Sequence, residues 1–189
     1  MAMAVPNTPT HWTVDMVQAL PDDGQRYEVI DGELFVTPSP SYDHQEAVLA
    51  LAVRLRGYLA AHRAGHAVIA PRDVQFGRDT AVQPDVFVVP LIGGRRPETS
   101  EEAGRPLLAV EVLSPNSARA DRGRKRALYQ RQGIPEYWIV DLDARVIERW
   151  RPGDERPEIL SERIGWQPEG AGEPLTIELP EFWGEVLDS

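Results

Sequence analysis

The sequence predicts one α/β domain in which a mixed central sheet is flanked by helices. The first indication of an α/β fold is that extended apolar runs alternate with two stretches of helical periodicity. No internal repeat or low-complexity linker divides the chain, and its 189 residues, 42% hydrophobic and 26% charged, suit one ordinary globular domain. We therefore expect a single domain over residues 1–189, with its core at about residues 26–151.

The core is predicted to begin with a β-hairpin. Residues 27–36 have extended character on both sides of Asp31-Gly32, a dipeptide typical of a two-residue turn. An amphipathic helix of about five turns follows, because apolar residues recur at three and four positions: Val48, Leu51, Ala52, Leu55 and Leu59. Asp43, with Glu46 three residues later, is its predicted N-terminal cap, and Gly65 marks its end.

Strands are predicted for the middle of the chain, at residues 66–70, 73–76 and 82–89, and residues 95–105 have the composition of a surface loop. A nearly continuous apolar run at residues 107–113, broken by Glu111, predicts a central strand buried on both faces.

A second helix is predicted to follow the capping residues Ser114-Pro115-Asn116-Ser117 and to end at Gly133. Two strands joined by a tight turn, at residues 136–141 and 145–150, complete the predicted core.

Composition limits the chemistry available to this protein. The chain has no cysteine, which excludes disulfides, thiolate zinc sites and cysteine nucleophiles and leaves oxygen and nitrogen ligands for a metal such as Mg²⁺. No apolar run approaches the roughly 20 residues that a membrane span needs. Residues 1–12 lack the basic and apolar regions of a secretory signal, so we expect a cytoplasmic protein without a membrane partner.

The charge distribution is uneven. A formal net charge of −10 argues against broad binding to nucleic acid, which usually requires a basic face. Residues 119–131, however, contain six basic side chains and a single acid, Asp121: Arg119, Arg122, Arg124, Lys125, Arg126 and Arg131. Arg122 and Arg126 of the second helix are therefore the candidate contacts to a nucleic-acid backbone.

Two acidic residues stand out in the predicted strands. Glu111 interrupts an apolar run, where an unpaired carboxylate would be costly to bury, and Asp85 follows Pro84 at the start of another apolar run. Each has an ordinary alternative explanation. Glu111 could form a structural ion pair or lie at a strand end in water, and Asp85 could serve only to form a turn. Together they favour a divalent cation, because neighbouring carboxylates resist joint ionisation without positive charge between them.

Lys125 is the single lysine in a chain that otherwise uses arginine. Helical spacing places it on the stripe of Asp121, Leu128 and Tyr129, which faces the core. The alternative is an Asp121–Lys125 ion pair on a solvated face. His44, on the inward side of the first helix, and Glu33, after the hairpin turn, are possible additional site residues, although packing and solvent exposure are their ordinary roles.

Several ordered motifs resemble the Uma-two family of restriction endonucleases. They are YEVIDGEL (residues 27–34), PSP followed by His44, QPDV (83–86), EVLSP (111–115), then Asp121, Lys125 and Tyr129, and GIPEYWIVD (133–141). The likeness implies the restriction-endonuclease-like core of the PD-(D/E)XK nuclease superfamily: helix, three strands, helix, strand. It also implies that Asp85 and Glu111 are the superfamily's acidic residues. The lysine expected two residues after the glutamate is replaced here by Leu113, and Lys125 in the following helix takes its place.

These observations favour a metal-dependent nuclease that hydrolyses phosphodiester bonds, with DNA as the expected substrate. Asp85 and Glu111 would hold Mg²⁺ or Mn²⁺, and Lys125 would orient or activate the attacking water or neutralise developing charge. One rival is a noncatalytic domain that binds nucleic acid or protein on the same fold. Another is a purely structural network of the three charged residues. DNA against RNA, and a homodimer against a monomer, stay open at this point.

Overall fold

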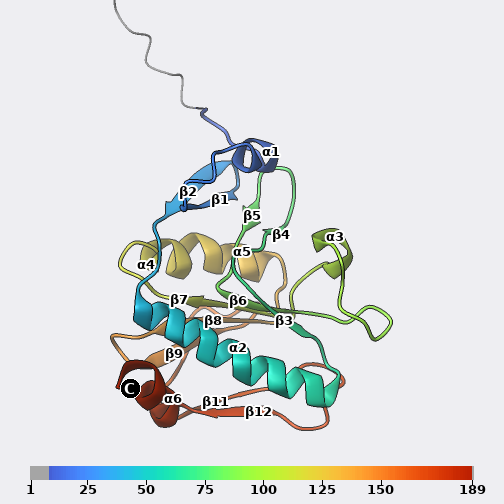
Figure 1. The fold of residues 1–189 in the computed structure, drawn as a ribbon, viewed down its shortest axis with the longest axis vertical. Coiled ribbons are helices and arrows are strands. Elements are labelled where there is room, and N and C mark those ends of the chain that lie inside the picture. Colours follow the sequence, from blue (N-terminus) through green and yellow to red (C-terminus); the bar gives the residue numbers. More distant parts are fainter. Residues whose placement is uncertain (1–8, 189) are drawn as a thin grey trace, which may run out of the picture.

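The structure, a computed structural model, describes residues 9–188. The expectation about a secretory signal concerns residues 1–12 and falls mostly outside this part. A six-stranded mixed sheet, with strand order β10-β9-β8-β7-β6-β3, forms the centre of the molecule (Figure 1). Only its central pair, β7 and β8, is parallel. The strands are β3 (His66–Ile69), β6 (Val86–Val89), β7 (Leu108–Val112), β8 (Glu136–Asp141), β9 (Val146–Trp150) and β10 (Glu158–Leu160).

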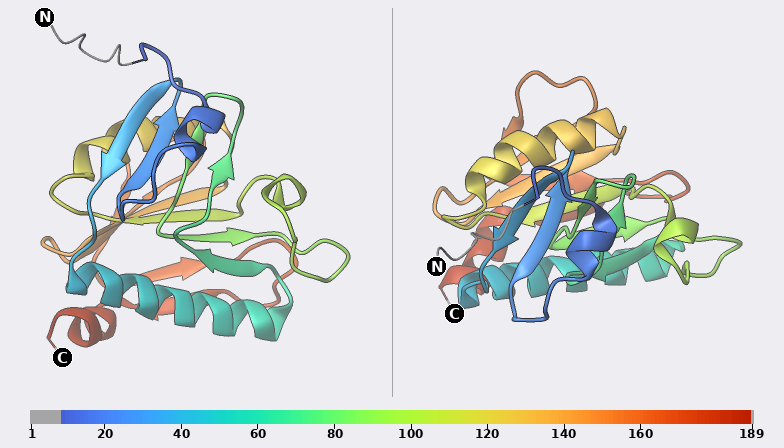
Figure 2. Two further views of the ribbon diagram at one scale, coloured as in Figure 1. Left: turned by 45° about the horizontal axis from the view of Figure 1, so that its top comes forward. Right: turned by 90° about the horizontal axis from the view of Figure 1, so that it is seen from above.

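Helices cover both faces of this sheet, as the sequence predicted. Helix α2 (Tyr42–His62) lies along one face, and the helical segment made of α4 (Ala118–Ala120), a π-helical turn η1 (Asp121–Lys125) and α5 (Arg126–Arg131) lies on the other (Figures 1 and 2). Side chains alternate between the two layers along β7. Val110 and Val112 belong to the apolar cluster under α2, while Ala109 packs in the cluster with Leu128 and Tyr129 of α5.

A smaller sheet of order β2-β1-β5-β4 lies on the α5 side. Its hairpin turns at Asp31-Gly32, both at positive φ, which confirms the predicted N-terminal hairpin. The strands are β1 (Arg26–Ile30), β2 (Glu33–Thr37), β4 (Val74–Gln75) and β5 (Ala81–Val82). In the part of the chain described, no helix is long and apolar enough to cross a membrane.

Several boundaries differ from the prediction. The predicted strand 82–89 is two strands in different sheets, β5 and β6, because Pro84 lacks an N–H and the backbone N–H of Gln83 is taken by the Glu28 carboxylate at 2.7 Å. The cap of α2 is Ser41 rather than Asp43, since the Ser41 hydroxyl accepts from the His44 N–H. The predicted loop 95–105 contains the short helix α3 (Ser100–Ala103).

Several elements lie outside the predicted core and were not predicted from the sequence. Helix α1 (Val14–Gln18) precedes the hairpin, and the C-terminal elements are β11 (Arg163–Trp166), β12 (Leu175–Glu178) and α6 (Leu179–Leu187). Ile164, Ile177, Phe182 and Trp183 of this C-terminal part belong to the same apolar cluster as α2. Residues beyond 151 therefore contribute to the main core.

Candidate active site

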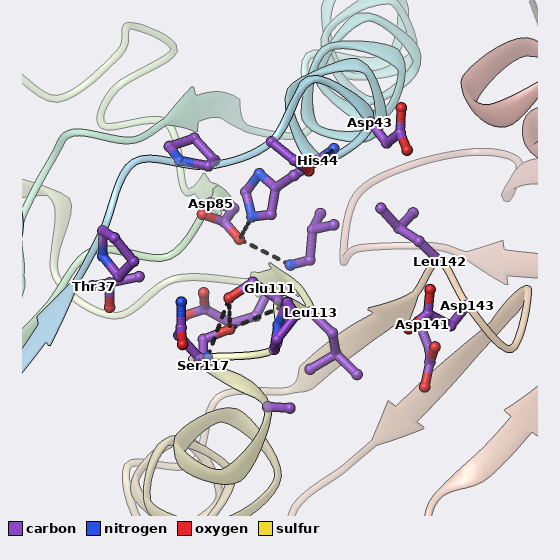
Figure 3. Close-up of a pocket in the computed structure, with 18 of the residues that line it drawn as sticks. Thr37, Asp43, His44, Asp85, Glu111, Leu113, Ser117, Asp141, Leu142 and Asp143 are labelled. Carbon is purple, nitrogen blue, oxygen red and sulfur yellow. Dashed lines mark hydrogen bonds and ion pairs between the residues drawn. The ribbon is translucent and has the colours of Figure 1, made fainter.

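A pocket of about 520 Å³ opens where α2 and the helical segment α4–η1 begin and where β7 ends. Asp85, Glu111 and Lys125, the three residues singled out in the sequence, all line it, and His44 lines it as well. Figure 3 shows His44 pointing from α2 toward Asp85, with Asp141, Leu142 and Asp143 on the opposite side of the pocket. The structure thus brings the predicted acids, the lysine and the histidine to one cavity.

Asp85 lies just before β6 and is fixed through both carboxylate oxygens. Its Oδ1 accepts a hydrogen bond from the Arg26 guanidinium at 2.7 Å, and its Oδ2 accepts one from the Val112 backbone N–H at 2.9 Å. The His44 Nε2 lies 3.1 Å from the same Oδ2. Burial alone would raise the pKa of Asp85, but the His44 hydrogen bond and the Arg26 charge outweigh it and lower the pKa to about 2. Asp85 is therefore a carboxylate throughout the physiological pH range.

Lys125 is buried beneath the pocket, with 3% of its surface exposed. Its Nζ lies 2.9 Å from Glu28 Oε2, 3.0 Å from Glu111 Oε1 and 3.5 Å from Asp121 Oδ1. Burial would lower the pKa of Lys125, but these carboxylates outweigh it and raise the pKa well above the ordinary value. Lys125 is therefore a permanent ammonium, and the alternative of a surface pair with Asp121 is wrong.

Glu111 belongs to the face of β7 that meets α5. Its Oε1 accepts hydrogen bonds from Lys125 Nζ and from the Tyr129 hydroxyl at 3.1 Å. Burial raises the pKa of Glu111 well above the ordinary value, Lys125 opposes this, and the nearby Asp121, Asp85 and Glu28 add to it. Around Lys125 the carboxyl groups therefore outnumber the positively charged side chains.

Asp121 shows this excess most clearly. The residue is fully buried, and neither carboxylate oxygen has a hydrogen-bond partner among the residues described. Burial raises the pKa of Asp121, with the Lys125 ammonium acting against it. Asp121 and Lys125 are the two ends of the π-helical turn η1, a rare conformation that is frequent at functional sites.

The remaining predicted site residues are not all near the pocket. Glu33 is exposed on β2 and pairs with Arg124 at 2.7 Å, so it does not line the cavity. Arg122 does line it, with its guanidinium bound to Asp141 and Glu148. Arg126 lies outside the lining residues, with its guanidinium 4.8 Å from the centre of the Trp150 ring.

Sequence reasoning missed three residues that complete the arrangement. Arg26 and Glu28 share one face of β1 with Ile30. The Glu28 carboxylate contacts both the Lys125 ammonium and the backbone N–H of Gln83, which is close to Asp85 in the chain. Tyr129 donates to Glu111 from α5. Glu28 and Tyr129 are part of motifs already visible in the sequence, but only the tertiary structure gives them partners.

The pocket offers carboxylate oxygens to a divalent cation. Within residues 9–188 no group of three or more histidine or acidic side chains forms a cage that could hold a metal. Magnesium needs less than this, since it commonly uses one or two carboxylates and otherwise retains water or binds substrate phosphate. Asp85 and Glu111 provide such a pair on the pocket wall, and the buried carboxylate of Asp121, whose one charged neighbour within 4 Å among the described residues is Lys125, adds negative charge beside it. Asp85 and Glu111 are therefore the two pocket residues that could hold such an ion.

Comparisons with known proteins identify the family and the fold of this chain. A family model described as "Putative restriction endonuclease", Uma2, matches residues 14–186. A solved structure, described as a putative nuclease belonging to DUF820 from Anabaena variabilis, has a TM-score of 0.76 at 22% sequence identity. The match covers 93% of this chain and 99% of that chain, and it shows a shared fold. A search of curated proteins found no match. Because the family model spans nearly the whole chain, this protein belongs to the Uma2 family, which is described as a putative restriction endonuclease family.

Proposed function

We propose that the protein is an endonuclease that hydrolyses phosphodiester bonds of DNA with Mg²⁺ or Mn²⁺, in the pocket formed around Asp85 and Glu111. The observation that carries this proposal is the burial of the chain's single lysine against the carboxylate of Glu111 on the wall of an open cavity. A buried ion pair is a poor source of stability, because desolvation opposes the Coulombic gain. Strongly perturbed ionisable groups in a cleft instead favour a functional site.

Asp85 and Glu111 would hold the cation, because carboxylate oxygens suit hard divalent metals. When bound, the cation supplies Lewis-acid chemistry to the phosphodiester. Arg26 and the Val112 N–H fix the orientation of Asp85, so this carboxylate is preorganised. Glu28 is a positioning residue for Lys125.

Lys125 has a narrower role than the sequence suggested. An ammonium whose pKa is raised well above its ordinary value has no free electron pair, so Lys125 cannot act as the base that takes a proton from water. We assign it instead the stabilisation of negative charge that develops on the phosphoryl oxygens. A guanidinium would be larger and planar, so it would not replace this compact charge.

Arg122 is the better of the two proposed backbone contacts. It lies on the pocket wall and is 43% exposed at its side chain, so a phosphate could compete with Asp141 and Glu148 for its guanidinium. Arg126 would contribute from outside the pocket. Because each arginine would displace counterions from a phosphate, such binding would weaken as the salt concentration rises.

The test is cleavage of supercoiled, linear and single-stranded DNA, with RNA in parallel, in the presence of Mg²⁺, Mn²⁺ or chelator. Asp85→Asn should remove metal-dependent cleavage, whereas Asp15→Asn, an exposed substitution on α1, should leave it unchanged. Cleavage that persists in chelator or in Asp85→Asn would contradict the proposed site. Binding of nucleic acid without cleavage by the parent protein would instead favour the noncatalytic domain.

A further inference from the structure

The outward face of α2 carries an apolar stripe that nothing in the described chain covers. Tyr42, Leu49 and Val53 are 91%, 57% and 61% exposed, and they are three of the large hydrophobic side chains most open to solvent. In both views of Figure 2, α2 runs along one side of the molecule with α6 beside its N-terminal half. The stripe itself therefore remains free to contact another surface.

The spacing of this stripe is that of a helix–helix seam. Its members are separated alternately by four and three residues, the pattern that keeps one helix face against a partner helix: Tyr42, Glu46, Leu49, Val53, Arg56 and Ala60. All six are exposed, whereas Leu51, at the centre of the same span, is completely buried against the sheet. The stripe is thus diametrically opposite the core side of α2.

The stripe is complementary to its own reversed copy. If a second α2 lies antiparallel across the level of Leu51, Leu49 faces Val53 of the second copy and Glu46 faces Arg56 of the second copy. The largest side chain, Tyr42, meets the small Ala60 at each end. Among the residues described, neither Glu46 nor Arg56 forms an ion pair within the chain, so both are available for this contact.

We propose that two copies of this chain associate through α2 as a symmetric homodimer. The interface is isologous, so each contact occurs twice, with apolar pairs at the centre and Glu46–Arg56 pairs on either side. Charge complementarity selects the antiparallel arrangement, because a parallel alignment of the two helices in register would place like charges opposite each other. The proposal concerns this surface alone and does not depend on the proposed nuclease activity.

The dimer would also fix the relation between the two pockets. Ser41, Asp43 and His44 at the N-terminus of α2 line the pocket, and an antiparallel pair of helices places the two N-termini at opposite ends of the interface. The two pockets would then be related by the two-fold axis.

The test is the dissociation constant of the full chain, measured by sedimentation equilibrium over a wide range of protein concentration. Glu46→Arg and Arg56→Glu should each weaken the dimer at least about tenfold, because each places like charges opposite one another at two symmetric positions. The double variant, Glu46→Arg with Arg56→Glu, should restore association because it exchanges the two charges. Glu155→Arg, an exposed charge reversal in the loop after β9, is the matched control and should leave the dissociation constant unchanged.

Leu49→Asp provides a second test at the apolar centre and should give a monomer, with circular dichroism confirming that the fold is retained. A parent protein that is monomeric at every concentration would overturn the proposal. So would a dimer that tolerates both single charge reversals as well as the control, since it would use another face. Failure of the double variant to recover would overturn the proposed pairing of Glu46 with Arg56.

Discussion

Replacing Lys125 by methionine removes a buried charge while nearly preserving the length of the side chain. The ammonium lies within 3.5 Å of three carboxylates, Glu28, Glu111 and Asp121, and is 3% exposed. Without it, the folded protein must bury an additional unpaired negative charge or take up a proton. Protonating a glutamate with an unperturbed pKa of about 4.3 costs about 3.7 kcal/mol at pH 7, at about 1.36 kcal/mol per pH unit. The expected loss of unfolding free energy is therefore about 4 kcal/mol, within the usual range for breaking a buried pair.

The same reasoning predicts how this loss depends on pH. A carboxyl group whose folded-state pKa is raised binds its proton at a higher pH in the folded protein than in the unfolded protein. Stability from that group is present at low pH and is lost as the pH rises through the folded-state pKa. For Lys125→Met the cost should accordingly fall from about 4 kcal/mol at pH 7 to about 1 kcal/mol at pH 5. In the parent protein Glu111 and Asp121 act in this direction. Asp85, with its pKa lowered to about 2, acts in the opposite one: its contribution to stability is present above the unfolded pKa of about 3.9 and is lost as the pH falls toward 2.

Urea unfolding followed by tryptophan fluorescence at pH 5 and pH 7 measures both quantities, since Trp138 is fully buried in the central sheet. Arg124→Met is the matched control, because Arg124 is the exposed neighbour of Lys125 and pairs with Glu33 at the surface. Its loss should stay below about 1 kcal/mol at either pH. A loss for Lys125→Met no larger than that of the control, or one that is equal at the two pH values, would refute the buried cluster.

The other predictions concern catalysis and binding. Lys125→Arg should abolish metal-dependent cleavage in an assay where the parent cuts, because a guanidinium cannot replace the compact ammonium. A surface lysine would tolerate this change, but at this buried position overpacking should also lower the unfolding free energy by about 1–3 kcal/mol. An active variant would remove Lys125 from the catalytic centre. Asp85→Asn should reduce the rise in melting temperature caused by Mg²⁺, because a ligand that binds only the native state stabilises it; an unchanged rise would place the cation elsewhere. Neutralising Arg122 and Arg126 together should flatten the salt dependence of DNA binding by up to about two units of slope, and an unchanged slope would assign the contact to another surface.

The local signals in the sequence predicted the parts of the fold that depend on neighbouring residues. The Asp31-Gly32 turn defines a hairpin by its backbone preference alone, and the apolar run around Glu111 is sufficient for a strand buried on both faces. The inward position of Lys125 followed from its helical spacing to Leu128 and Tyr129, and the structure buries all three. These residues were predictable because a single element decides their orientation.

The partners of those residues were not predictable in this way. Glu28 reaches Lys125 only because β1 pairs with β5 and the small sheet packs beside α5, contacts between segments far apart in the chain. The same limit applies to Arg122, whose place in a dense basic segment indicated a contact to nucleic acid, although Glu148 on β9 binds its guanidinium. The strand predicted at residues 82–89 was wrong because hydrophobicity does not record that the chain changes sheets at Pro84.

The contacts within the site join residues at very different separations along the chain. Glu111 and Lys125 are separated by 14 residues and belong to neighbouring elements, whereas Arg26 and Asp85 are separated by 59. Loop-closure entropy grows with the logarithm of this separation, so closing the longer loop costs about 1.3 kcal/mol more than closing the shorter one. During folding, the lysine–glutamate half of the site should therefore form with the central strand and helix, before the arginine of the hairpin reaches Asp85. A chain interrupted at that stage would already pair Lys125 with Glu111, while Asp85 still lacked its contact with Arg26.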